Sequence, residues 1–212
     1  NDCKVKITDP NNSNAYDIGA GSFWLRGDIT VTDPNDGDES WKVGTAHDIT
    51  WTKKGNISTV AISYSTNGGS NWTGIASAIP AGDLSWTWNI PTNETLTLQG
   101  RIKVADEAYL NSVYDISDNN FVVKGNLTLL TPDAAGIVLT YAGSPYNITW
   151  QRDGVIATIT ILYSTNGGTT YPNTIVSGKD ASLGTHPWDI PNAIGTNLKV
   201  KIVDDGNSSV SD

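Results

Sequence analysis

The chain has 212 residues and a formal net charge of −9, with only 13 Lys and Arg residues. This balance excludes the basic surface that nucleic-acid-binding proteins need, because an acidic chain repels the phosphate backbone. A single cysteine and the absence of methionine exclude a disulfide framework or a thiolate metal site within one chain, and no apolar run approaches the roughly 18 residues of a membrane span.

The sequence repeats itself at a period of about 98 residues. Trp51 recurs as Trp150, and the turn at residues 65–69 (Ser-Thr-Asn-Gly-Gly) recurs unchanged at residues 164–168, both at an offset of 99. Self-similarity at a fixed period indicates one folding unit strung in series. The function can therefore depend on the array of repeats as much as on a single repeat.

Within each repeat, short apolar runs alternate with polar residues and are separated by Gly, Asn, Asp and Pro, which predicts an all-β fold. Asn67-Gly68 predicts a two-residue type I′ hairpin turn between two strands. About seven short strands in each repeat predict tandem immunoglobulin-like antiparallel β-sandwiches. The positions that share a strand face, in chain order, are Ile29 and Val31, Ile49 and Trp51, Val60, Ile62 and Tyr64, Leu84, Trp86, Trp88 and Ile90, and Ile102 and Val104.

The repeat alignment predicts three segments. Residues 1–27 are the C-terminal strands of a preceding repeat, residues 28–125 are a complete repeat, and residues 126–212 are a second repeat that lacks its last strand. We therefore expect the chain to be an excerpt of a longer array. The joins contain no Pro-, Gly- or Ser-rich spacer, so very short linkers are expected to give a stiff rod.

Several motifs of the first repeat resemble an extracellular repeat module of bacterial and archaeal cell-surface proteins of the surface-layer type. These motifs are residues 34–41, Val43-Gly44, residues 49–51, residues 64–69, residues 88–91 and residues 104–106. The module is related to the Ser/Thr-rich wall proteins of yeast that take part in β-glucan assembly. The resemblance covers residues 29–125 well and residues 126–212 less well. It implies an immunoglobulin-like sandwich outside the membrane, and it carries over no catalytic residue.

The acidic loop that begins at Asp33 has the composition of a calcium loop. It is not an EF-hand, because Gly37 is fifth from Asp33 and the twelfth position is Gly44 instead of Glu. A looser calcium site near the join between repeats stays open, against the alternative of a solvated acidic turn. Its candidate ligands are Asp33, Asp36, Asp38, Asp106, Asp115 and Asp118, and no cofactor other than calcium is expected.

The tryptophans divide into two groups. Trp51, Trp88, Trp150 and Trp188 recur in phase with the strands, which predicts core positions. The repeat does not demand Trp at the positions of Trp24, Trp72 and Trp86, so these three are candidates for binding a glycan or a protein partner. Possible N-glycosylation sites occur at Asn11, Asn56, Asn71, Asn93, Asn126, Asn147 and Asn207.

No catalytic residue is predicted, because His47 and His186 lie at unrelated positions of the repeat and neither adjoins a nucleophile motif. The leading hypothesis is a non-catalytic structural part of a long cell-surface protein that spaces and assembles. Its expected partners are neighbouring copies, flanking repeats or a surface polysaccharide, and neither nucleic acid nor membrane insertion of this segment is expected. A carbohydrate-binding accessory module of a secreted enzyme and an adhesin stalk, suggested by Arg26-Gly27-Asp28, are the alternatives.

Overall fold

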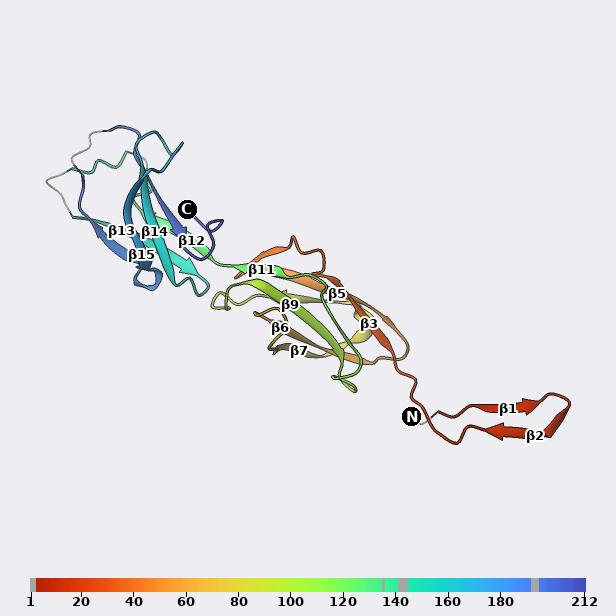
Figure 1. Cartoon of the computed structure of the whole chain (residues 1–212). Coiled ribbons are helices and arrows are strands. Elements are labelled where there is room, and N and C mark those ends of the chain that lie inside the picture. Colours follow the sequence, from red (N-terminus) through yellow and green to blue (C-terminus); the bar gives the residue numbers. More distant parts are fainter. Residues whose placement is uncertain (1–2, 135, 141–144, 192–194) are drawn as a thin grey trace.

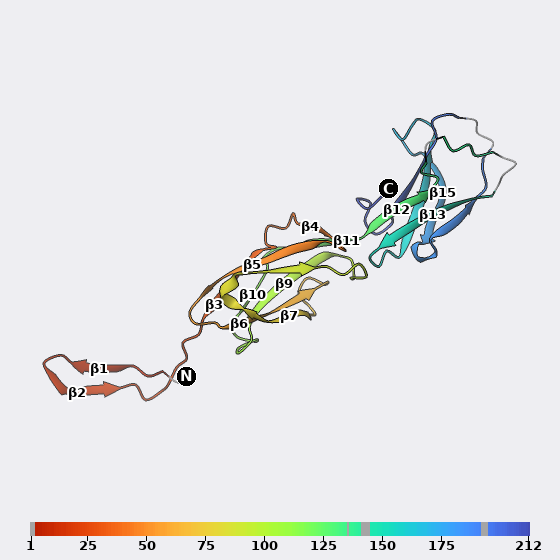
Figure 2. The same ribbon diagram turned by 180° about the vertical axis from the view of Figure 1, so that it is seen from behind.

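The computed structural model describes residues 3–134, 136–140, 145–191 and 195–212. The chain is all-β, with two short 3-10 turns among the described residues. Figure 1 shows a hairpin and two strand-rich units arranged in line, and Figure 2 shows the same order from behind. No helix in these described ranges is long and apolar enough to cross a membrane.

The first unit is a sandwich of two sheets. One sheet has the order β3 (Asp28–Asp33), β5 (Ala46–Lys54), β8 (Ser85–Asn89). The other has the order β4 (Ser40–Lys42), β11 (Phe121–Lys124), β9 (Thr97–Asp106), β6 (Thr59–Ser65), β7 (Thr73–Pro80), with β10 (Tyr114–Ile116) also on β9. The unit thus has nine strands instead of about seven, because the short strands β4 and β10 flank the longer ones.

The second unit repeats this plan. One sheet has the order β12 (Asn126–Thr131), β13 (Tyr146–Asp153), β16 (Thr185–Trp188), and the other has the order β15 (Asn173–Asp180), β14 (Thr158–Ser164), β17 (Lys199–Asp204). Val31 faces Trp51 in the ladder of β3 and β5, and Leu129 faces Trp150 in the ladder of β12 and β13. The repeat in the sequence is therefore also a repeat in strand register.

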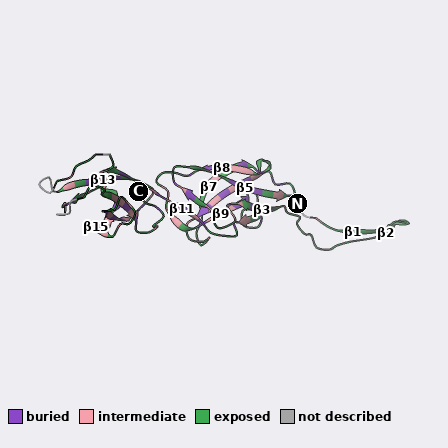
Figure 3. Cartoon of the chain, turned by 90° about the horizontal axis from the view of Figure 1, so that it is seen from above, coloured by how far each residue is buried: buried purple, intermediate pink, exposed green. Residues whose placement is uncertain are grey.

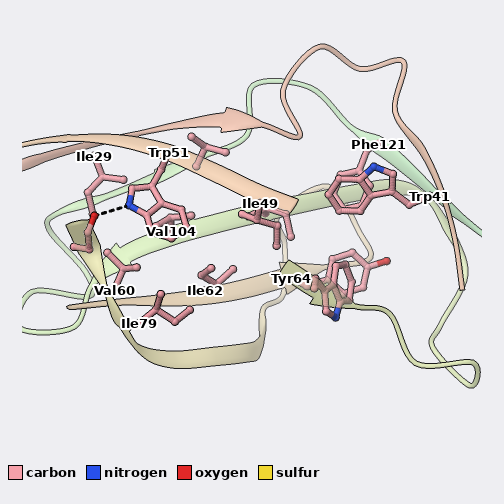
Figure 4. Packing of buried hydrophobic residues seen from close by; sticks show 14 of the residues in the cluster. Ile29, Trp41, Ile49, Trp51, Val60, Ile62, Tyr64, Ile79, Val104 and Phe121 are labelled. Carbon is pink, nitrogen blue, oxygen red and sulfur yellow. Dashed lines mark hydrogen bonds between the residues drawn. The ribbon is translucent and has the colours of Figure 1, made fainter. Parts of the chain in front are cut away.

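The core of each unit lies between its two sheets, and most of the alternating positions face it as predicted. Leu84 is the exception: it ends the 3-10 turn before β8 with a positive φ and is 42% exposed. Trp51, Trp88, Trp150 and Trp188 are all buried, which confirms their predicted role. In Figure 4 the indole nitrogen of Trp51 points toward a backbone carbonyl, that of Ala81, to which it donates at 3.3 Å, and Trp150 donates to the carbonyl of Ala181 at 2.9 Å. Each buried indole therefore satisfies its polar edge as well as filling the sandwich.

The turn at Asn67-Gly68 differs from the prediction. The strands β6 and β7 are separated by residues 66–72, and positive φ angles occur at Gly68 and Gly69 instead of at Asn67 and Gly68. The Ser65 hydroxyl accepts hydrogen bonds from the backbone N–H groups of Asn67 and Gly69, at 3.3 and 2.9 Å. This side-chain capping of the loop replaces the two-residue turn, and Ser164 caps the second unit's loop in the same way.

The N-terminal segment forms a hairpin of β1 (Lys6–Asp9) and β2 (Asn12–Ile18), followed by an isolated bridge between Cys3 and Phe23. Every residue of β1 and β2 is exposed, and Figure 3 shows the hairpin in the colour of exposed residues, apart from the purple strands of the first unit. The segment therefore holds strand pairing without a core of its own.

Candidate functional site

The acidic loop between β3 and β4 is organised by Glu39. Its carboxylate accepts backbone N–H bonds from Asn35 and Asp36 through Oε1 and from Gly37 through Oε2, the last two at 2.8 Å. Burial opposes ionisation of Glu39, but these N–H bonds together outweigh it and hold the pKa of Glu39 below its ordinary value. Glu39 is thus a structural anion at the centre of the loop, and the sequence analysis did not single it out.

The carboxylates around Glu39 create a negative field. Asp36, Asp38 and Glu39 place one oxygen each within 4.8 Å of one another, and both aspartates are exposed. Burial, followed by the neighbouring charges of Glu39, Asp36 and Asp48, raises the pKa of Asp33. Carboxylate oxygens are the ligands that calcium prefers, so Asp36 and Asp38 are the candidates for holding a cation here.

The loop is also tied to the segment that precedes β11. The Asn35 side chain donates to Asp118 Oδ2 at 3.1 Å and accepts from the Asp118 N–H at 2.6 Å, and the Asn119 side chain donates to the Asn35 carbonyl at 2.9 Å. Asp118 therefore lies beside the acidic loop, as the calcium hypothesis expected, but its carboxylate already accepts a hydrogen bond from the Asn35 side chain.

Asp106 and Asp115 have other partners. Asp106 is buried and accepts the N–H of Ala108 at 2.9 Å, whereas Asp115 accepts the N–H of Val31 at 2.8 Å. Among the described residues, neither joins the group around Glu39. Their counterparts Asp204 and Asp212 accept N–H bonds in the second unit at 2.9 and 2.7 Å. Their recurrence in both repeats is the sequence signal that would have identified a structural role.

The three candidate binding tryptophans do not gather on one surface. Trp24, in the segment before β3, is 62% exposed, and Trp72 precedes β7 in one sheet while Trp86 lies on β8 in the other. Trp86 packs against the first core. The Arg26 guanidinium lies 4.7 Å from the ring of Trp24 and 4.9 Å from that of Tyr109. Because Arg26 stacks in this way, the Arg26-Gly27-Asp28 tripeptide is part of a packed join.

The sequons are all accessible to some degree. Asn11, Asn56, Asn71, Asn93 and Asn147 are exposed, and Asn126 and Asn207 are half-buried.

The two histidines lie in different units. The ring of His47 stacks on that of Trp41, with 4.7 Å between the ring centroids, and its Nε2 lies 2.9 Å from the Thr45 hydroxyl. Burial lowers the pKa of both histidines.

The joint between the two units contains packing contacts whose residues the sequence analysis did not identify. Leu96 contacts both hydrophobic cores, and the N–H of Gly154 donates to the carbonyl of Thr92 at 2.6 Å. A Cβ atom on Gly125, between β11 and β12, would lie 2.6 Å from the Asp153 carbonyl oxygen and 2.9 Å from Ile156. Only glycine fits at this position, so the linker lies pressed against the second unit.

The comparisons with known proteins add little. No family model matches the sequence, and no curated protein matches it. A solved structure described as Clostridium thermocellum CbhA fibronectin(III)-like modules is similar to the chain at 18% identity and a TM-score of 0.28, over 86% of this chain and 88% of that one. Because the TM-score is low, we draw nothing from this likeness.

Proposed function

We propose that this chain is a non-catalytic structural part of a modular cell-surface protein, in which it acts as a stiff rod that spaces and assembles. The observation that carries the proposal is the packing of Leu96 into both hydrophobic cores. A side chain shared by two cores resists bending, because any change of angle exposes apolar surface on one side or the other.

The joint is supported from several directions. The backbone bond from Gly154 to Thr92 fixes the turn after β13 against the loop before β9. Gly125 separates β11 from β12 by one residue, so the linker has little freedom of its own. The entry to the first unit is built alike, since a Cβ atom on Gly27 would lie 2.6 Å from Ile57 and 2.8 Å from the Lys54 carbonyl oxygen. A repeated joint geometry is what a rod of uniform direction requires.

An exterior location is part of the same proposal. The negative charge of the chain and its exposed sequons support this part of the proposal. A calcium ion held by Asp36 and Asp38 is a further element of the proposal, since it would join carboxylates of the acidic loop and stiffen this part of the first unit.

The stiffness is tested by measuring the distance distribution between the units. Spin labels at Ser77→Cys and Ser177→Cys, two exposed positions on β7 and β15, report it by pulsed electron resonance in a Cys3→Ser background. We expect a narrow distribution in the parent and a broad one in the Leu96→Ala variant.

Leu110→Ala is the matched control, because Leu110 is 46% exposed and lies in the loop between β9 and β10. It should leave the distribution narrow. A parent distribution as broad as that of Leu96→Ala would overturn the rod.

A further inference from the structure

The strand β8 forms an open edge of the first sandwich. It ends the sheet order β3, β5, β8, and within the described chain it pairs only with β5 (Figure 3). The backbone bonds at its two ends, from Trp51 to the Leu84 carbonyl and from Ile90 to the Thr45 carbonyl, lie on the side of β5. Bonded residues alternate along an antiparallel strand, so the odd-numbered residues of β8 turn their N–H and C=O groups away from β5. These residues are Ser85, Thr87 and Asn89.

The other outer strands of the first unit carry features that oppose pairing with a further strand. On β3, the N–H of Val31 already donates to Asp115 at 2.8 Å. On β7, a positive φ of 56° at Ala78 and two shifts of register against β6 distort the strand. The strands β4 and β10 have only three residues each. By contrast, β8 pairs in regular register over five residues and contains neither a proline nor a charged residue. Such an edge can accept another strand.

The second unit has a proline at the corresponding edge. Asp48 faces Thr87 in the ladder of β5 and β8, and Asn147 faces Pro187 in the ladder of β13 and β16. Pro187 has no N–H to donate to a strand beside β16. The position also tolerates proline, since β16 forms with Pro187 in it. The open edge is therefore a property of the first unit, in the interior of the chain.

Trp86 lies beside this open edge and is incompletely covered. It packs against the first core but is only half-buried, whereas Trp88 on the same strand is 3% exposed. The counterpart of Trp86 in the second unit is His186. An apolar ring next to outward-facing backbone groups offers an added strand both hydrogen bonds and contact area.

We propose that β8 pairs with β8 of a second copy, antiparallel and centred on Thr87, so that the β3–β5–β8 sheets of two copies form one continuous sheet. In this register Ser85 lies opposite Asn89 on the polar face, and Trp86 lies opposite Trp88 on the core face. The contact uses the same surface on both copies, as a two-fold interface does. This inference rests on the proposed function, because it names the partner with which the rod assembles.

The distribution of charge favours a second copy as the partner, although the chain carries a net charge of −9. Asp83 is the only charged residue in residues 81–93. Antiparallel pairing places the two Asp83 residues at opposite ends of a paired strand about 17 Å long, beyond the Debye length of about 8 Å. The two Asp48 residues are separated by three strand spacings, about 14 Å. Like charges are thus kept apart, and uncharged residues meet at every position of the paired strands.

The direction of β8 determines how the two rods lie. The long strands of the first unit run along the line that joins the two units (Figure 1), and the view from behind agrees (Figure 2). Because the two β8 strands are antiparallel, the paired rods lie side by side and point in opposite directions. Pro187 opposes the same contact at the second unit, so each rod makes it once. The pairing therefore joins rods laterally.

The first test is the mass of the 212-residue chain as a function of concentration, by sedimentation velocity, in the parent and in Thr87→Pro and Thr87→Val. Both variants lose the bond from the Thr87 hydroxyl to Asp48, but only proline removes the N–H at the centre of the edge. We expect a reversible dimer in the parent and in Thr87→Val. In Thr87→Pro the association should weaken at least about tenfold, because the two-fold contact loses two N–H bonds at once.

The proline variant should still fold, because Pro187 occupies the same position in the second unit. Circular dichroism and the thermal midpoint check this. A parent that stays monomeric, a dimer that survives Thr87→Pro, or an equal loss in the proline and valine variants overturns the proposal.

The second test traps the register. In a Cys3→Ser background, Ser85→Cys with Asn89→Cys should give a disulfide-linked dimer under mild oxidation. Opposed residues of a hydrogen-bonded pair have Cα atoms about 5.5 Å apart, which is within disulfide reach. Each single cysteine variant is a control and should stay largely monomeric, because its thiol faces no second thiol. A dimer yield as high in the single variants, or no dimer in the double variant, contradicts the pairing.

The spin-label distances between Ser77→Cys and Ser177→Cys are also measured in the Thr87→Pro variant, where each chain is expected to be a monomer. A narrow distribution in a parent chain that never dimerises removes the lateral pairing and leaves the rod. A broad distribution removes the rod whether or not the copies pair.

Discussion

Asp115 Oδ2 accepts a hydrogen bond from the backbone N–H of Val31 at 2.8 Å, and this bond ties β10 to the first strand of the opposite sheet. The second unit contains the same bond between Asp212 and Leu129, at 2.7 Å. An aspartate therefore closes the same corner of both sandwiches, across more than 80 residues of sequence in each case.

Removal of this corner bond should destabilise the first unit. Asp115→Ala leaves the N–H of the buried Val31 without its acceptor, which costs about 1–3 kcal/mol of unfolding free energy. Asp115→Asn keeps an acceptor oxygen and should cost less. Chemical denaturation of both variants checks this, and equal losses for Ala and Asn would show that charge, and not the hydrogen bond, is what matters.

The buried tryptophans should be the most sensitive positions. Trp51→Ala and Trp150→Ala each remove a large ring and its bond to a backbone carbonyl, and each should cost about 3–5 kcal/mol. Trp24→Ala, at an exposed ring, is the control and should leave the thermal midpoint nearly unchanged. A midpoint within a degree or two of the parent in either core variant would contradict the assigned packing.

The core could be predicted because it depends on period and repetition. Trp51 and Trp150 stand at the same position of the two repeats, in strands whose apolar and polar residues alternate. Because alternate side chains of a strand lie on opposite faces, the alternation places both rings on the face toward the core. The all-β sandwich follows from the same alternation. The loop at Asn67-Gly68 could not be predicted, because the Ser65 hydroxyl competes with the backbone for the N–H groups of the turn.

The candidate site was predicted only in part, for a related reason. Asp36 and Asp38 lie together because they are neighbours in the chain. Asp106 instead accepts the N–H of Ala108 in its own loop, and Asp115 accepts the N–H of Val31, which only the fold brings near it. Leu96 carries no local signal at all, since its two cores are formed by strands distant in sequence. Contacts between units are set by tertiary packing, which a pattern of polar and apolar residues does not specify.

Calcium binding at the acidic loop should raise the thermal midpoint of the first unit. A ligand that binds only the folded state adds about 2.7 kcal/mol at a concentration one hundred times its dissociation constant. The measurement compares millimolar calcium with chelator. The rise should vanish in a variant with Asp36→Asn and Asp38→Asn, and an unchanged parent midpoint would remove calcium from the proposal.

Glu39 should make the first unit sensitive to acid. Its pKa is lower in the folded chain than in the unfolded one, so its carboxylate stabilises the fold above the unfolded pKa, and this stabilisation is lost as the pH falls through the folded pKa. Asp33 opposes this trend, because its raised pKa makes protonation easier in the folded chain.

Glu39→Gln should therefore lower the stability near neutral pH, where the carboxylate is charged, and should flatten the decline of stability between about pH 5 and pH 3, around the ordinary glutamate pKa. Glu94→Gln is the matched control, because Glu94 is a loop glutamate outside the Asp33–Glu39 segment. Denaturant unfolding at a series of pH values measures both effects. A parallel displacement of the whole Glu39→Gln curve, with the acid slope unchanged, would show that the shape of the side chain and not its charge organises the loop.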